Sequence, residues 1–339
     1  MSKHFSTVLR FKHCGMPWFC VFSLLLSNSA AVAQSQLEDV HVAPRGPLIS
    51  AADSAAVTRA AHPILRKTVD LVLVPVTVTD PMQRLVTGLQ SDNFQLFENG
   101  EEQRIKHFSS EDAPVSLGII VDTSGSMGDK IESAREAVKE FCDTANPEDE
   151  FFLITFSDEP RLVHDFTDSP EELELNLAFA KPRGRTALLD AIYLGARKMR
   201  EAKYGRKAMI IISDGGDNHS RYSERELKSV LKESDVEIYA IGTFDRYVPT
   251  PEEVLGPELL SDIAETSGGR AFILEKLEEM PLLARRIGIE LRTQYVLGYS
   301  PGARPHDGKW HKIKIKLKVP KNLPYLQARS RTGYYASKE

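Results

Sequence analysis

The stretch from residue 115 to residue 128 reads VSLGIIVDTSGSMG, an apolar run that ends at Asp122 and continues into small polar residues. A run this apolar is typical of a strand that is buried on both faces of a parallel sheet. Three further runs of strand length follow along the chain, at residues 151–156, 208–212 and 236–241. The sequence therefore predicts a parallel sheet, with Asp122 at the carboxyl end of its first strand.

Segments with helical periodicity alternate with these strands. The clearest one places five apolar side chains on a single face: Ile131, Ala134, Val138, Phe141 and Cys142. Other helices are expected to start near Pro170, Ala187, Glu224 and Pro257, and a strand at 270–274 precedes a last helix at about 279–292. This alternation predicts an α/β domain over residues 113–292, with a doubly wound, mostly parallel, Rossmann-like sheet.

Strand patterns flank this domain on both sides. Residues 65–112 contain a long strand with an edge position or bulge at Pro75, and shorter strands near 94–97 and 103–108. Residues 293–339 contain strands at 295–299, 312–319, 326–330 and 333–335. About 45 residues on each side are too few for a separate core. We predict that the two flanks pair into one small β-sandwich in which the α/β domain is inserted.

The N-terminus has the features of a secretory signal peptide. Basic residues precede an apolar stretch from Met16 to Leu26, which is followed by Ala31-Val32-Ala33. Cleavage after Ala33 predicts a secreted or periplasmic protein, and an uncleaved N-terminal anchor is the alternative. Residues 34–64 are rich in Ala, Ser and Pro, and we interpret them as a flexible leader.

Charge and cysteine content exclude several classes of partner and fold. Loss of the three basic residues of the signal moves the formal charge from −5 to −8, which disfavours nucleic acid and anionic membranes as partners. The mature chain keeps one cysteine, Cys142, so it forms no internal disulfide, and we expect a buried, unreactive thiol. No stable membrane insertion is expected after signal cleavage.

Three polar loops follow predicted strands or open predicted helices. Asp122-Thr123-Ser124-Gly125-Ser126 follows the first strand, Gly184-Arg185-Thr186 precedes the helix near Ala187, and Ser213-Asp214-Gly215 ends the strand at 208–212. The first loop alone is better explained as a helix cap, because Asp and Ser are common capping residues. All three loops together place carboxylates and hydroxyls where open α/β sheets bind ligands.

These loops resemble the metal-ion-dependent adhesion site of the von Willebrand factor A family. The resemblance covers about residues 115–290 and assigns five metal-site residues: Asp122, Ser124, Ser126, Thr186 and Asp214. It implies an open coordination position that captures an Asp or Glu side chain of a protein partner. The hard oxygen donors independently favour Mg²⁺, with Ca²⁺ and Mn²⁺ as alternatives. The flanking strands are similar to those of exported bacterial proteins whose A domain lies between β elements.

The leading hypothesis is an exported, metal-dependent module for protein binding and cell adhesion, without catalytic residues. One alternative is a structural envelope component whose metal only stabilises the loops. A less favoured one is a metal-assisted hydrolase, because the sequence contains no G-x-x-x-x-G-K-[ST], H-E-x-x-H or G-x-S-x-G motif. Asp190 is expected to order its own helix, Asp217 to hold a turn or lie behind the site, and His219 to be a solvated loop residue.

Overall fold

The computed structural model describes residues 71–214, 216–244, 251–302, 307–319 and 325–336, with the side chains of residues 251–253 excepted. The predicted signal peptide and leader lie outside these ranges, as do residues 65–70 of the first predicted β segment. Within the described ranges, no helix combines the length and apolar character needed to cross a lipid bilayer.

A six-stranded sheet forms the centre of the α/β part. Its strands are β5 (Ser116–Asp122), β6 (Glu150–Phe156), β7 (Pro160–Thr167), β8 (Lys207–Ser213), β9 (Glu237–Thr243) and β10 (Arg270–Leu274). The spatial order is β10-β9-β8-β5-β6-β7, and only β7 runs antiparallel to its neighbour. The predicted mostly parallel sheet is confirmed. The edge strand β7 was not predicted, because its half-exposed sequence has no apolar run.

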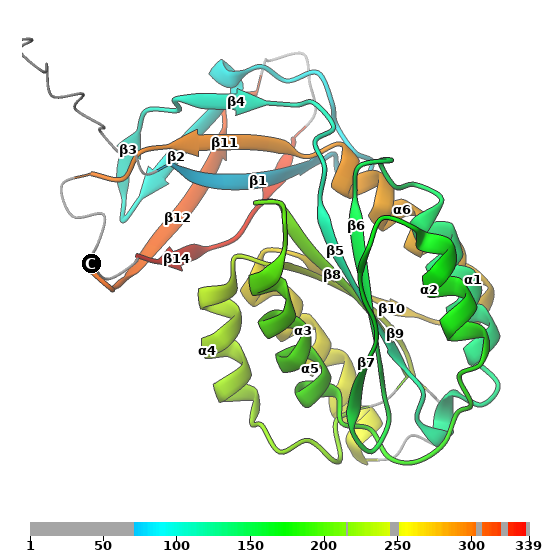
Figure 1. Cartoon of the computed structure of the whole chain (residues 1–339). Helices are drawn as coiled ribbons and strands as arrows, with labels where there is room; N and C mark the ends of the chain where they lie inside the picture. Colours follow the sequence, from blue (N-terminus) through cyan, green and yellow to red (C-terminus); the bar gives the residue numbers. More distant parts are fainter. Residues whose placement is uncertain (1–70, 215, 245–250, 303–306, 320–324, 337–339) are drawn as a thin grey trace, which may run out of the picture. The chain divides into compact units, whose positions relative to one another are not determined.

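Helices cover both faces of this sheet (Figure 1). On one face lie α1 (Ile131–Cys142), α2 (Pro170–Ala178) and α6 (Met280–Arg292), whose apolar residues share one buried cluster. On the other face lie α3 (Leu188–Lys198), α4 (Glu224–Ser234) and α5 (Pro251–Ser267), which share a second cluster. Short 3-10 turns lie at η2 (Gly125–Met127), η3 (Met199–Glu201) and η4 (Leu277–Glu279). The helix expected to start near Pro257 begins instead at Pro251, since proline also suits a first helical position.

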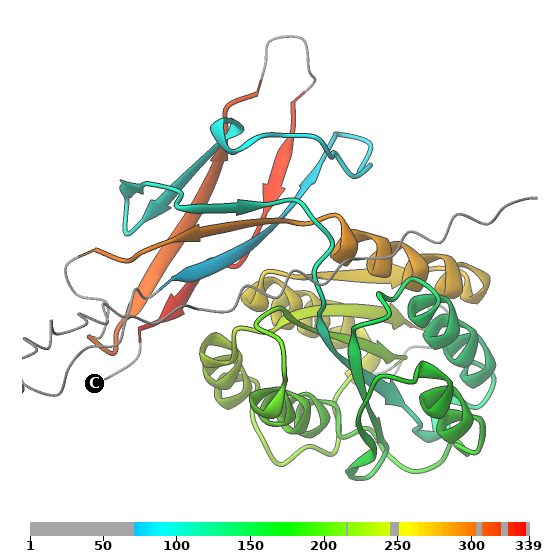
Figure 2. The same ribbon diagram turned by 45° about the horizontal axis from the view of Figure 1, so that its top comes forward.

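The flanking segments pair with each other, as predicted. The N-terminal flank contributes β1 (Val72–Thr79), the 3-10 turn η1 (Ser91–Asn93), β2 (Phe94–Glu98), β3 (Glu101–Gln103) and β4 (His107–Ser109). The C-terminal flank contributes β11 (Tyr295–Tyr299), β12 (Trp310–Leu317), β13 (Gln327–Arg329) and β14 (Gly333–Tyr335). They form two antiparallel sheets (Figure 2), β13-β1-β11-β4 and β14-β12-β2-β3. The two sheets share one apolar core.

One local prediction in the flanks needs correction, and the open choice at Pro75 is decided in favour of an edge position. The strand expected at 103–108 is divided into β3 and β4, because the chain leaves one sheet after Gln103 and joins the other at His107. The pairing of β1 with β11 passes Pro75 without a register shift, so there is no bulge. Pairing with β13 covers only Thr77–Thr79, so Pro75 lies on a stretch of β1 with a strand on one side only. That edge position suits a residue without an N–H donor.

Helix α6 packs closely against α1 at Gly288. A Cβ atom at this position would overlap the side chain of Thr144 and come within 3.3 Å of the Phe141 carbonyl oxygen. The Thr144 hydroxyl donates a 2.6 Å hydrogen bond to that same carbonyl, so it has little freedom to move away. Glycine at position 288 therefore allows the close approach of α6 to α1. Helix α1 follows the Asp122 loop, and α6 leads into the sandwich.

We expect Gly288→Ala to lower the free energy of unfolding by about 1–3 kcal/mol, because the added methyl group overpacks the α1–α6 contact. Urea unfolding followed by circular dichroism measures the change. Gly205→Ala is the matched control, since no atom lies within 4 Å of the position of its added Cβ. Equal losses in the two variants would contradict the close packing at Gly288.

Candidate metal centre

Asp122 and Asp214 lie at the carboxyl ends of two neighbouring strands. Asp122 is the last residue of β5, Asp214 directly follows β8, and the two parallel strands pair up to Val121 and Ile212. Both aspartates are fully buried. The fold thus places two carboxylates side by side where such a sheet presents its ligands.

Hydrogen bonds connect the first loop to both carboxylates. The Ser126 hydroxyl donates to Asp214 Oδ1 at 2.9 Å and lies 3.1 Å from the Ser124 hydroxyl oxygen. Asp122 accepts from the Ser124 amide at 2.8 Å and from the Ser213 hydroxyl at 2.6 Å. The structure therefore brings four of the five predicted site residues into one hydrogen-bonded group.

Within the described residues, Thr186 joins this group through its loop and not through a hydrogen bond of its own hydroxyl. The amide of Gly125 donates to the Gly184 carbonyl at 3.1 Å, which connects the first and second loops. The Thr186 amide donates to Asn218 Oδ1 at 3.0 Å, and its carbonyl accepts from the Asn218 amide, which connects the second and third loops. Backbone contacts thus tie all three predicted loops together.

The second loop requires glycine at position 184. Its φ of +81° lies in the left-handed region, and a Cβ atom there would lie 2.5 Å from Asp158 Oδ2. Asp158 uses its other oxygen to accept a 2.9 Å hydrogen bond from the Arg185 amide. Asp158 and Gly184 therefore fix the path of the loop that carries Thr186.

A lysine that the sequence analysis did not select also reaches the site. Lys130, at the start of α1, places Nζ 2.6 Å from Asp214 Oδ2 and 3.2 Å from the Ser126 carbonyl oxygen. Its side chain is only 15% exposed. Ser213 and Asn218 were not selected as site residues either. Ser213 lies within the third predicted loop, and Asn218 lies close to that loop in sequence.

The electrostatics of the site are dominated by burial of the two aspartates. Burial, followed by the negative charge of Asp214, raises the pKa of Asp122 to about 7, while hydrogen bonds from Ser213 and Ser124 act in the opposite direction. Two buried like charges are unfavourable unless a positive charge lies close to them. The site is therefore arranged to accept a cation, and the Lys130 ammonium already supplies one beside Asp214.

The donor set fits a hard cation. In the described part of the chain, no three His, Cys, Asp or Glu side chains form a metal-binding cluster, so any ion here depends on the hydroxyls as well as the carboxylates. Two carboxylates and three hydroxyls are oxygen ligands of the kind that Mg²⁺ and Ca²⁺ take in proteins. Ser126 is exposed, which leaves the group accessible from solvent.

The structure also shows the contacts of three residues outside the predicted metal site: Asp190, Asp217 and Cys142. Asp190 lies in the first turn of α3, where a carboxylate is favourable, and its Oδ1 also accepts from the amides of Arg221 and Tyr222, so it holds the segment before α4 as well. Asp217 holds a turn by accepting from the Ser220 hydroxyl. Cys142 is buried as predicted, and burial raises the pKa of its thiol.

The family follows from comparison with known proteins. The model of the von Willebrand factor type A domain matches residues 117–286, which is half of the chain and contains all five predicted site residues. The chain belongs to the von Willebrand factor type A (VWA) domain family. Domains of this family are typically interaction modules without enzymatic activity, and those with a metal-ion-dependent adhesion site bind divalent cations.

Individual relatives are distant. Inter-alpha-trypsin inhibitor heavy chain H4 of Bos taurus is 31% identical over 116 residues, which cover 31% of this chain and 13% of the relative's length. A von Willebrand factor type A structure from Catenulispora acidiphila is 14% identical, covers 80% of this chain and 74% of its own, and has a TM-score of 0.46. Mussel proximal thread matrix protein 1 with a zinc-occupied metal site is 19% identical, with coverages of 57% and 49% and a TM-score of 0.45.

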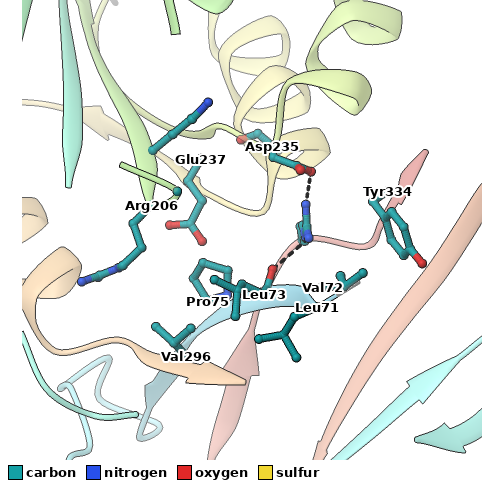
Figure 3. A pocket seen from close by; sticks show the side chains of 13 residues that line it. Leu71, Val72, Leu73, Pro75, Arg206, Asp235, Glu237, Val296 and Tyr334 are labelled. Atoms are coloured by element: carbon teal, nitrogen blue, oxygen red, sulfur yellow. Dashed lines mark hydrogen bonds and ion pairs between the residues drawn. The ribbon is translucent and has the colours of Figure 1, made fainter. Parts of the chain in front are cut away.

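A cavity of about 260 Å³ lies between the VWA domain and β1, away from the candidate metal centre. Arg206, Glu237 and Asp235 line it from the starts of β8 and β9 (Figure 3). Asp122 and Asp214 lie at the opposite ends of their strands. Arg331 donates to Asp235 and to the Leu73 carbonyl across it. The cavity belongs to the junction with the sandwich and contains none of the predicted site residues.

Glu237 is the most perturbed acid at this junction. It is 6% exposed, and its Oε2 accepts a 2.7 Å hydrogen bond from Gln294 Nε2. Burial raises the pKa of Glu237 to about 7, against smaller opposing effects of Gln294 and Arg206. The folded chain therefore holds a proton at Glu237 more tightly than the unfolded chain does.

Protonation of Glu237 makes the free energy of unfolding depend on pH. The contribution of Glu237 is most favourable below about pH 4.5, decreases as the pH rises toward 7, and is constant above that. Glu237→Gln should remove the Glu237 part of this decrease and raise the free energy of unfolding at pH 8 by up to about 3 kcal/mol relative to the wild type. The part due to Asp122, whose pKa is also raised to about 7, should remain. Urea unfolding from pH 5 to pH 8 measures the change, with the exposed Glu278→Gln as control. A decrease that is equally steep in the wild type and in Glu237→Gln would contradict the assignment.

Proposed function

We propose that this chain is an exported protein-binding module that holds a divalent cation at Asp122, Ser124, Ser126, Thr186 and Asp214. Mg²⁺ is the proposed ion, with Ca²⁺ and Mn²⁺ as alternatives, because every donor is a hard oxygen. The observation that carries the proposal is the convergence of three loops on two buried carboxylates, Asp122 and Asp214, of which Asp214 forms an ion pair with Lys130. Export is supported by the N-terminal segment that ends at Ala33.

The proposed partner is a protein that presents an Asp or Glu side chain. When bound, the ion would supply a Lewis-acidic centre with an open position for a carboxylate. The chain's own residues do the rest: Ser124 and Ser126 would provide neutral ligands, while Asp122 and Asp214 orient them through hydrogen bonds. Neutral hydroxyls leave most of the ion's charge uncompensated, so an acidic side chain is attracted.

Ion binding is the first test of this proposal. We expect isothermal titration with MgCl₂ to show one site in the wild-type chain, at least tenfold weaker binding in Ser126→Ala, and no binding in Asp214→Ala. Asp129→Ala is the matched control, because Asp129 is an exposed carboxylate in the same loop. Ser126 is exposed, so Ser126→Ala should fold even if Asp214→Ala does not. Equal Mg²⁺ binding by wild type and Ser126→Ala would contradict the assigned ligands.

Partner capture is the second part of the same test. Photo-crosslinking in envelope extracts of the native host should yield a partner with MgCl₂ and not with EDTA, and Ser126→Ala should reduce the yield while Asp129→Ala should not. Replacement of one partner Asp or Glu by its amide should abolish capture. If Mg²⁺ raises the melting temperature but no capture depends on it, the structural alternative is correct and the binding function is wrong.

A further inference from the structure

Lys130 is held inside the candidate metal centre by two contacts. Its ammonium donates to Asp214 Oδ2 at 2.6 Å and to the Ser126 carbonyl at 3.2 Å. A lysine on a protein surface usually keeps its ammonium in water and its side chain mobile. The Lys130 side chain is 15% exposed and its partner carboxylate is fully buried. Water therefore has little access to this ion pair and weakens it little.

A second lysine on the same helix shows the contrast. Lys139 pairs with Asp143 at 2.7 Å, but the two side chains are 55% and 43% exposed. Exposed pairs of this kind contribute little to stability because water screens them. The charge of Lys130 therefore acts on the site, whereas the charge of Lys139 does not. Lys139 serves as the reference lysine in the experiments below.

Both oxygens of Asp214 are already in use. Oδ1 accepts from the Ser126 hydroxyl and Oδ2 accepts from Lys130. A divalent cation held by Ser124 and Ser126 would lie close to this carboxylate, whether the carboxylate binds it directly or through water. Two positive centres that share one buried carboxylate repel each other strongly at low effective dielectric. Occupation of both positions beside Asp214 at the same time is therefore unfavourable.

We propose that Lys130 is a built-in counter-ion that competes with the divalent cation for Asp214, so that ion binding displaces the Lys130 ammonium from the site. This inference rests on the proposed function, because it requires that the five-residue site binds an ion. Without the ion, Lys130 compensates the charge of Asp214 and keeps the first and third loops together. With the ion, the same compensation comes from the metal. Lys130 thereby stabilises the ion-free loops, and by the same amount of free energy it weakens the affinity of the site for the ion.

Lys130→Met tests the competition, because methionine keeps an unbranched apolar side chain and removes the charge. We expect the Kd for Mg²⁺, measured by isothermal titration at constant ionic strength, to fall about tenfold or more in Lys130→Met. Lys139→Met should leave it within about twofold of the wild type. Equal Mg²⁺ affinity of the wild type and Lys130→Met would overturn the inference while the proposed function stands. Failure of both to bind Mg²⁺ would instead overturn the proposed function and this inference with it.

Lysine reactivity in the wild-type chain tests the displacement itself. Labelling with acetic anhydride, followed by peptide mass spectrometry, gives the rate at Lys130 relative to Lys139 in the same molecule. We expect the Lys130 to Lys139 ratio to be low with EDTA and to rise severalfold at saturating MgCl₂, as the ammonium leaves Asp214. A ratio that does not change on Mg²⁺ binding would contradict displacement, and this measurement does not depend on the folding of any variant.

Discussion

Burial of Asp122 and Asp214 beside each other is the constraint on which the rest of the site depends. Neighbouring parallel strands carry them to the same edge of the sheet, and neither is exposed. Two carboxylates in this position are unfavourable by desolvation and mutual repulsion, which is why the pKa of Asp122 rises to about 7. The serines and the ammonium of Lys130 offset this penalty through hydrogen bonds and charge. A divalent cation would do so more completely.

Hydrogen bonds between buried polar residues connect the β-sandwich to the VWA domain. Helix α6 leads into β11, and Glu290 near its end accepts from Tyr239 of β9 and from Arg329 of β13. Gln294 donates to Glu237 and accepts from Arg206 in the same region. Buried polar networks of this kind are stable only when both sides are present. The flanks and the inserted domain therefore support each other's folded state.

Much of this architecture could be predicted from the sequence because parallel strands buried on both faces leave long apolar runs. The end of one such run at Asp122, and the two later loops with Thr186 and Asp214, were enough to select residues that the fold brings together. Pairing of the flanks followed from their small size.

The errors have physical reasons. Strand β7 is half-exposed and has no apolar run, and the division between β3 and β4 depends on which sheet each piece joins. The role of Lys130 depends on a side-chain conformation directed toward a carboxylate 84 residues away, which no local pattern encodes. Asp190 likewise binds amides of Arg221 and Tyr222 in another loop.

The most direct test of the central claim is the location of an ion in crystals grown with MnCl₂, read from anomalous diffraction near the manganese absorption edge. The account predicts one strong anomalous peak within about 2–2.5 Å of the hydroxyl oxygens of Ser124 and Ser126. That peak should lie beside Asp122 and Asp214, with the Lys130 ammonium turned away. A peak elsewhere, or none at this site at saturating Mn²⁺, would contradict it.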